Sequence, residues 1–150
     1  MIQRVKSYIQ QNNLFNSGTP ILVACSGGVD SMVLIDALLK LNFKIVIAHC
    51  NFQLRGEESN EDEKFVTQFA QQNNIDFHSI KFDTKDFKKD KTISTQMAAR
   101  ELRYEWFEKI RKENQYHFIA TAHHLDDQLE TILLNFTKGT GIKGLKGIQA

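Results

Sequence analysis

The sequence predicts an α/β fold, an open doubly wound and mainly parallel sheet with helices on both faces. Short apolar runs alternate along the chain with longer segments that carry apolar residues at helical spacing. Continuous apolar strands are typical of a parallel sheet, because crossover helices shield both of its faces from water. The 150 residues, 41% of them hydrophobic, suffice for one domain with its own core.

The first half of the chain contains two predicted strand–helix pairs. Residues 21–25 are apolar and are expected to form a buried strand, and residues 30–41 form the helix that follows. The β-branched run at 44–50 predicts the second strand. A polar loop leads into the next helix, where Asn60 and Glu63 match a capping box.

The second half repeats the alternation. Residues 75–83 predict a third strand, which is more amphipathic and is therefore expected near a sheet edge. The lysine-rich segment around 87–91 is expected to be a loop, and Ser94 to cap a long helix after it. Residues 116–122 predict the fourth strand, and residues 126–136 a last helix.

Charge and cysteine content limit the classes of function. The formal net charge is +1, so contact with a polyanion requires a local basic patch. Cys25 and Cys50 form no C-x-x-C motif, which favours free thiols in a reducing compartment. No apolar run approaches the roughly 18 residues of a membrane span, and residues 1–14 lack a signal-peptide cleavage site. We therefore expect a cytoplasmic protein without a membrane partner.

In a doubly wound sheet, ligands bind beyond the carboxyl ends of the strands. In this sequence a glycine-rich turn follows the first predicted strand, so it lies where a ligand is expected. Ser26, Gly27 and Gly28 lead directly into a helix, whose first N–H groups can bind an anion such as phosphate. No lysine follows, so the turn is not a Walker A loop. Asp30 would repel phosphates unless Mg²⁺ lay between them. The alternative, an ordinary turn capped by Asp30 and Ser31, has about equal weight on composition alone.

Two further strand ends carry candidate binding residues. His49 ends the second strand, where it could contact a nucleotide or be a half-buried imidazole bonded to a backbone carbonyl. Arg100 and Arg103 are neighbours on one helix surface, where guanidinium groups can meet phosphate oxygens. Two arginines are also ordinary on a solvated helix face, and both interpretations remain open.

The segment 120–131 is the richest in candidate residues. If a helix begins near His124, then His123, Asp127 and Glu130 share one side of it. Such a set could bind a metal, act as acid and base, or receive a cationic substrate. Helix capping by Asp126 and Asp127 is the alternative. It explains the two aspartates but not the pair of histidines or Glu130.

The motif S-G-G-V-D-S resembles the PP-loop of the N-type ATP pyrophosphatases, which split ATP between its α- and β-phosphates. Four further segments extend the resemblance to the N-terminal catalytic domain of the tRNA(Ile)-lysidine synthetases. These segments are H-C-N-F-Q-L-R-G-E-E-S, Q-M-A-A-R-E-L-R-Y, A-H-H-L-D-D-Q-L-E-T and T-K-G-T-G-I-K-G-L-K-G-I. The resemblance implies an adenine nucleotide alpha hydrolase-like fold and the use of ATP and Mg²⁺. It also implies ligation of L-lysine to C2 of the wobble cytidine, through an adenylated intermediate.

The resemblance also implies roles for individual residues. The nucleotide contacts would be Ser26, Gly27, Gly28, Val29, Asp30 and Ser31, with His49 and Arg100 beside them. Asp30 would hold the metal, and Arg103 would neutralise the leaving pyrophosphate. Asp127 and Glu130 would recognise lysine, with His123 nearby for positioning or proton transfer. Which acid meets which amine is left open.

The implied partners are L-lysine and tRNA(Ile) with a CAU anticodon, and homodimer formation is left open. We expect residues 1–150 to be a PP-loop ATP pyrophosphatase domain that stops before the rest of the catalytic domain and the C-terminal tRNA-binding modules. Whether such a chain is active alone is also left open. Lys138, Lys143 and Lys146 could meet tRNA phosphates or lie in a solvated loop.

Three other functions fit parts of the sequence. A tRNA thiolase of the same superfamily needs reactive sulfur, against which the absence of C-x-x-C counts. A metal-dependent phosphohydrolase built on H-H-L-D-D disagrees with the strand signals. A nucleotide-sensing module without catalysis would leave Asp127 and Glu130 without a role.

Overall fold

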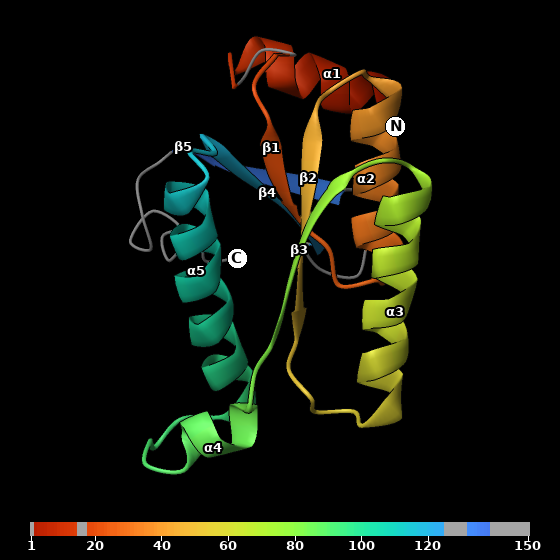
Figure 1. Ribbon diagram of the computed structural model, residues 1–150. Coiled ribbons are helices and arrows are strands. Elements are labelled where there is room, and N and C mark those ends of the chain that lie inside the picture. Colours follow the sequence, from red (N-terminus) through yellow and green to blue (C-terminus); the bar gives the residue numbers. More distant parts are fainter. Residues whose placement is uncertain (1, 15–17, 125–131, 139–150) are drawn as a thin grey trace.

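In the part of the chain that the structure describes, five strands form one sheet in the order β3-β2-β1-β4-β5 (Figure 1). The computed structural model describes residues 2–14, 18–124 and 132–138. The strands are β1 (Ile21–Ala24), β2 (Ile45–Asn51), β3 (Asp76–Lys81), β4 (Phe118–His124) and β5 (Ile132–Lys138). β1 pairs in parallel with β2 and β4, β2 pairs in parallel with β3, and only the β4–β5 pairing is antiparallel. The predicted edge position of the third strand is confirmed.

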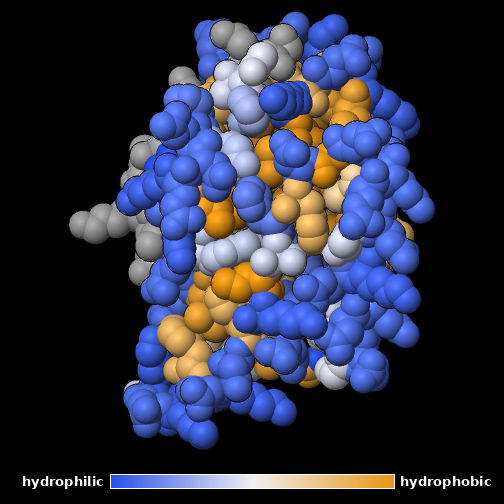
Figure 2. All heavy atoms as spheres, in the orientation of Figure 1, coloured by the Kyte–Doolittle hydropathy of each residue, from blue (hydrophilic) through white to orange (hydrophobic). Residues whose placement is uncertain are grey.

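Helices cover both faces of the sheet, which confirms the predicted fold class (Figure 1). They are α1 (Ile2–Gln11), α2 (Val29–Lys40), α3 (Glu57–Gln72), α4 (Thr84–Lys88) and α5 (Thr95–Glu113). α2 and α3 lie on one face and α5 on the other (Figure 1). Figure 2 shows hydrophilic side chains along α5 and α3 and hydrophobic ones between them. Within the part of the chain that the structure describes, no helix combines the length and apolar character needed to cross a bilayer.

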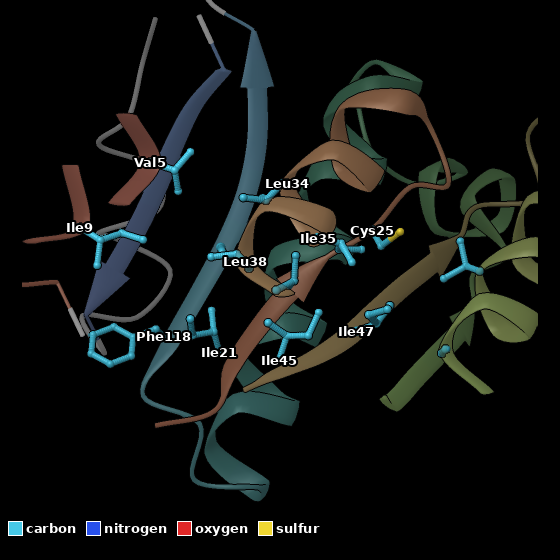
Figure 3. Close-up of a cluster of buried hydrophobic side chains, with 14 residues drawn as sticks. Val5, Ile9, Ile21, Cys25, Leu34, Ile35, Leu38, Ile45, Ile47 and Phe118 are labelled. Atoms are coloured by element: carbon cyan, nitrogen blue, oxygen red, sulfur yellow. The ribbon is translucent and has the colours of Figure 1, made fainter. Parts of the chain in front are cut away.

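Two hydrophobic clusters hold the layers together, one on each face of the sheet. Because side chains alternate along a strand, Ile21 and Val23 of β1 join the cluster under α2 and α3, whereas Leu22 joins the cluster under α5. Val5 and Ile9 of α1 extend the first cluster (Figure 3). α1 lies at the amino end of the strands (Figure 1), so the carboxyl end remains for a site.

The predicted last helix is wrong over residues 132–136, which belong to strand β5. The apolar residues of this segment fit the period of a strand as well as that of a helix. A short apolar run does not distinguish the two structures. Pairing with β4, from His124 opposite Ile132 to Phe118 opposite Lys138, provides hydrogen bonds for the backbone groups of β5 that point toward β4. The remainder of that predicted helix, residues 126–131, lies outside the described residues.

The predicted loop around 87–91 is also partly wrong, because α4 occupies its first residues. The Asp83 carboxylate caps α4 by accepting a hydrogen bond from Asp86 N at 2.9 Å. The loop was predicted from the lysine content of this segment, which does not take account of the capping signal of Asp83. The predicted cap of the following helix is confirmed, since Ser94 Oγ accepts from Met97 N at 3.1 Å.

The capping box predicted for Asn60 and Glu63 is wrong. α3 begins earlier, at Glu57, after Gly56. Asn60 and Glu63 are instead interior residues of α3, and both side chains accept hydrogen bonds from Asn51 Nδ2. The distance from Nδ2 is 3.2 Å to Asn60 Oδ1 and 2.9 Å to Glu63 Oε2. They therefore fix the carboxyl end of β2 against α3.

A partly buried ion pair stabilises the end of α5. Arg111 donates hydrogen bonds from Nε and Nη2 to the two oxygens of Glu108, at 2.9 and 2.8 Å. These bonds lower the pKa of the Glu108 carboxyl below its ordinary value of 4.5. A carboxyl with a lowered pKa stabilises the fold above that ordinary value and loses this contribution as the pH falls through its folded value.

We expect Glu108→Gln to lower the free energy of unfolding at pH 7 by about 1–3 kcal/mol, because it removes the charge that pairs with half-buried Arg111. The difference from wild type should begin to shrink as the pH falls below about 4.5, and it should be lost once the pH passes the lower pKa of Glu108 in the folded protein. Urea unfolding at several pH values measures both effects. Glu113→Gln is the control, since the pair between Glu113 and Lys109 is exposed. Equal losses in the two variants would contradict the expectation.

Candidate functional site

A pocket opens at the carboxyl ends of β1, β2 and β4. The strand order reverses there, because β2 and β3 lie on one side of β1 and β4 lies on the other. Ligands of open α/β sheets bind at such a reversal. The pocket volume is about 210 Å³, below the roughly 300–1,000 Å³ of typical ligand sites. The described residues therefore surround only part of a ligand as large as a nucleotide.

The turn between β1 and α2 forms one wall of the pocket and needs glycine at its centre. Gly27 has a φ of +87°, a conformation that L side chains rarely adopt. A Cβ at Gly27 would lie 3.4 Å from Val66 Cγ2 and 3.5 Å from Asp62 Cβ of α3. The backbone of the turn thus packs directly against α3.

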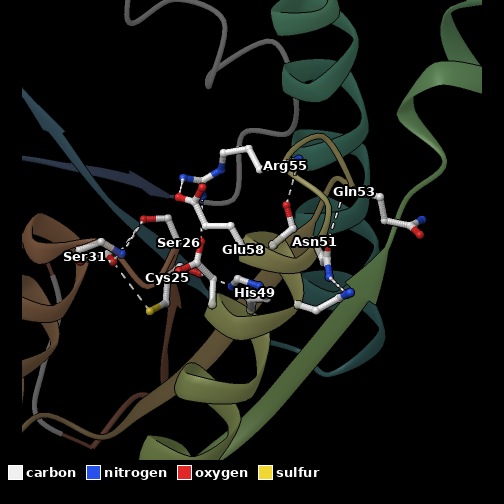
Figure 4. Close-up of polar contacts among 12 residues, drawn as sticks. Cys25, Ser26, Ser31, His49, Asn51, Gln53, Arg55 and Glu58 are labelled. Carbon is white, nitrogen blue, oxygen red and sulfur yellow. Dashed lines mark hydrogen bonds and ion pairs between the residues drawn. The ribbon is translucent and has the colours of Figure 1, made fainter.

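Two serine hydroxyls order the same turn (Figure 4). Ser26 Oγ accepts a hydrogen bond from Gly28 N at 3.2 Å, and Ser31 Oγ donates to Gly28 O at 2.9 Å. The two hydroxyl oxygens lie 3.3 Å apart. Gly28 caps α2 without a side chain, so a ligand can approach the first turn of the helix closely. Half-buried Asp30 lines the pocket at this turn.

β2 and α5 form the other walls. Ala48, Cys50 and Phe52 line the pocket at alternate positions, as expected for one face of a strand and its extension. Arg103 of α5 also lines it, and its guanidinium carbon lies 5.2 Å from the centre of the Phe52 ring. The pocket therefore contains a carboxylate, Asp30, and a guanidinium. This charge pattern suits a phosphate group bound together with a cation.

The two thiols near the pocket are poorly ionised. Burial raises the pKa of Cys50 to about 12, although the charge of Arg103 lowers it. Burial also raises the pKa of Cys25, against hydrogen bonds with Ser31 and Gly27 that lower it. A thiol is nucleophilic as the thiolate, so neither cysteine is prepared for sulfur chemistry.

His49 lies behind the turn and not among the pocket-lining residues. It is 2% exposed, and its Nδ1–H donates to Cys25 O at 2.8 Å (Figure 4). This contact matches the alternative interpretation of His49 from the sequence, an imidazole bonded to a backbone carbonyl. Its Nε2 has no hydrogen-bond partner among the described residues. His49 holds the carbonyl that immediately precedes Ser26, so it supports the turn.

An ion-pair cluster at the beginning of α3 supports the turn from the same side as His49. Arg55 Nη2 lies 2.7 Å from Asp62 Oδ2, and Arg55 also pairs with Glu58 (Figure 4). The Asp62 side chain is one of the two that a Cβ at Gly27 would touch. The sequence analysis gave Asp62 no role, because its proximity to the turn depends on how α3 packs against the sheet.

The structure separates the two arginines that the sequence treated together. Arg103 lines the pocket, whereas Arg100 is exposed and lies over the Tyr104 ring, 5.1 Å from its centre. Arg100 is not among the pocket-lining residues, and its contact with a nucleotide stays a prediction.

Of the three candidates His123, Asp127 and Glu130, the described residues include only His123. Thr121 and Ala122 of β4 line the pocket, and His123 is the next residue along the strand, not the start of a helix. Asp127 and Glu130 lie outside the described residues, as do Lys143 and Lys146. Their roles stay predictions.

Several pocket residues were missed by the sequence analysis. Phe52, Tyr104, Phe107 and Thr121 all line the pocket. Phe52 could have been found by extending the alternation of β2 beyond Cys50, and Phe107 by its i, i+4 spacing from Arg103. Tyr104 directly follows Arg103, so helical spacing from Arg103 does not indicate it. Thr121 stands in a predicted strand, where it resembles an ordinary core residue.

A metal ion would need ligands from the substrate. Among the described residues no group of three or more histidine, cysteine or acidic side chains could hold a metal. Asp30 is a single carboxylate, and Mg²⁺ is commonly bound by one or two carboxylates together with substrate phosphates. The donor set therefore fits Mg²⁺ that arrives with a polyphosphate.

Comparison with known proteins identifies the family of the chain. Residues 1–150 match the family described as PP-loop domain. The chain is 52% identical over 147 residues to tRNA(Ile)-lysidine synthase from Bacteroides thetaiotaomicron, covering 98% of this chain and 34% of the relative. It is 45% identical over 149 residues to the synthase of the same name from Parabacteroides distasonis, covering 99% and 34%. The chain thus spans about a third of the length of these relatives.

Solved structures support the fold alone. An NH3-dependent NAD synthetase from Campylobacter jejuni superposes with a TM-score of 0.58 at 15% identity, covering 79% of this chain and 53% of that one. A predicted subunit of tRNA methyltransferase from Methanocaldococcus jannaschii gives a TM-score of 0.51 at 21% identity, covering 86% and 63%.

We expect Gly27→Ala to weaken binding of Mg²⁺ and ATP about tenfold or more. The substitution strains a left-handed backbone by about 1–2 kcal/mol and brings Cβ against α3, which displaces the turn. Isothermal titration calorimetry measures the affinity. Gly56→Ala is the matched control, because Gly56 also has a positive φ but nothing lies within 4 Å of its Cβ position. Equal loss of affinity in both variants would show that the turn does not bind the phosphates.

Proposed function

Because the chain belongs to the PP-loop domain family, we propose that it binds ATP with Mg²⁺ at the turn of residues 26–31 and activates a wobble cytidine for attack by L-lysine. The observation that carries this proposal is the meeting of Asp30 and Arg103 in one pocket, at the end of a glycine turn. The names of the relatives support the choice of tRNA(Ile) as substrate. The proposed enzyme is a ligase that forms a C–N bond.

The proposed reaction has two steps. The O2 oxygen of cytidine attacks the α-phosphorus of ATP, and pyrophosphate leaves. The amine of lysine then attacks C2, AMP leaves with the oxygen, and the amine loses a proton. Adenylation is needed because a cytosine carbonyl is a poor electrophile without a good leaving group. Mg²⁺, when bound, neutralises charge on the phosphates.

The chain's own residues would divide this work. The Gly27 amide and the first N–H groups of α2 would bind phosphate oxygens, with Ser26 and Ser31 fixing the turn. Asp30 would place the metal against the phosphates. Arg103 would balance the negative charge that grows on departing pyrophosphate. His49 would contribute indirectly, through Cys25 O.

The acceptor side of the reaction rests on residues after β4. We propose that Asp127 and Glu130 receive the lysine ammonium and that His123 positions or moves a proton. His123 follows the pocket-lining Ala122, which supports this assignment. A CAU anticodon, L-lysine and a cytoplasmic location belong to the same proposal, and homodimer formation remains open.

The thiolase alternative is disfavoured by the raised pKa values of both cysteines. A nucleotide-sensing module without catalysis remains as the second candidate. The two candidates differ in whether pyrophosphate release depends on RNA.

We expect Asp30→Asn to lower RNA-dependent pyrophosphate release about a hundredfold or more in the full-length protein, because the metal loses its charged ligand. The matched control is Asp36→Asn on the same helix, an exposed aspartate paired with Lys40. The assay contains CAU-anticodon tRNA, ATP, Mg²⁺ and labelled lysine, and follows both pyrophosphate and label in RNA.

Three outcomes would contradict the proposal. Pyrophosphate release without RNA, or ATP binding without any release, would favour another activity or a sensor. Incorporation of sulfur in place of lysine would favour a thiolase. Persistent transfer of lysine by Asp127→Ala would remove that residue from the acceptor side.

A further inference from the structure

The segment 81–100 is distinctly basic in a chain that is nearly neutral. It contains six basic and three acidic residues, whereas the rest of the chain contains 13 basic and 15 acidic residues. Four of its lysines belong to α4 and the turn after it, and we call them the lysine surface: Lys85, Lys88, Lys89 and Lys91. The proposed chemistry of the pocket uses none of them.

The lysine surface adjoins the pocket. Thr84, the first residue of α4, is buried, and its Oγ1 donates to Phe52 O at 2.8 Å. Phe52 lines the pocket, and Lys85 directly follows Thr84. Lys88 Nζ donates to Thr95 Oγ1 at 3.2 Å, which joins α4 to the beginning of α5. α4 thus lies at the carboxyl end of the sheet, beside the helix that carries Arg103 (Figure 1).

The charges of this surface are available to an external partner. Lys85, Lys89 and Lys91 are exposed. Lys89 pairs with Asp86 at 3.1 Å, but both side chains are more than half exposed, and Lys91 lies 3.5 Å from Glu101 in a second exposed pair. Exposed pairs of this kind contribute about 0–1 kcal/mol, so a phosphate can replace the carboxylate with little loss.

The opposite side of the pocket carries the opposite charge. The first two turns of α3 contain five acidic residues and face α4 across the carboxyl end of the sheet (Figure 1). These residues are Glu57, Glu58, Glu61, Asp62 and Glu63. A polyanion is therefore repelled from the α3 side and attracted to the α4 side, which gives it one direction of approach.

We propose that the lysine surface binds the sugar–phosphate backbone of the RNA whose base enters the pocket. This inference rests on the proposed function and adds the surface on which the RNA lies. Lysine contacts to phosphates position a strand without reading its sequence, so the surface would contribute affinity and orientation, and the pocket would select the base.

The test compares two triple variants of the full-length protein. Lys85→Gln, Lys89→Gln and Lys91→Gln together remove three charges from the lysine surface. The control variant changes Lys6, Lys44 and Lys109 to Gln, three exposed lysines at or toward the amino end of the sheet. Affinity for CAU-anticodon RNA is measured over a range of salt concentrations, and affinity for ATP is measured separately.

We expect the lysine-surface variant to bind RNA about tenfold more weakly at low salt, with a slope of log affinity against log salt shallower by about two. The control variant should resemble wild type, and both variants should bind ATP normally. Equal RNA affinity in the two variants would overturn the lysine surface, while RNA-dependent pyrophosphate release by wild type would still uphold the proposed function. Failure of wild type to bind RNA would overturn both.

Discussion

The reversal of strand order between β1 and β4 is the constraint on which the rest of the structure depends. β1 connects through α2 on one face of the sheet, and β4 is reached through α5 on the other face. The two connections diverge, so the carboxyl ends of these neighbouring strands are left open between them. Asp30 comes from one connection and Arg103 from the other. Residues that are far apart in the chain thereby face a single pocket.

The turn after β1 can serve this opening because it is supported from behind. The left-handed Gly27 packs against Asp62 of α3, and His49 holds the carbonyl of Cys25. The supports contact the turn from α3 and β2, whereas the pocket opens between the turn and α5. Support and binding therefore use different sides of the turn, and the phosphate-binding backbone needs no side chain in the ligand's path.

The parallel part of the fold could be predicted because its strands are continuous apolar runs, which only a sheet covered on both faces explains. Residues 132–136 could not, since their apolar residues fit a strand as well as a helix, and pairing with β4 decides between them. In the site, Asp30 was predictable from local charge chemistry beside a glycine turn. Selecting Arg103 over Arg100 for the pocket required the rotation of α5, which depends on tertiary packing. Asp62 was missed for the same reason, whereas the alternation of β2 beyond Cys50 indicates Phe52.

The central claim is that the turn of residues 26–31 binds a polyphosphate with its metal beside Asp30. A crystal structure with Mn²⁺ and an ATP analogue that resists cleavage between the α- and β-phosphates tests it most directly, since the anomalous signal locates the metal. We predict Mn²⁺ in direct contact with the Asp30 carboxylate, and the phosphates on the Gly27 amide and the first N–H groups of α2. A nucleotide bound elsewhere, with no metal at Asp30, would contradict the account.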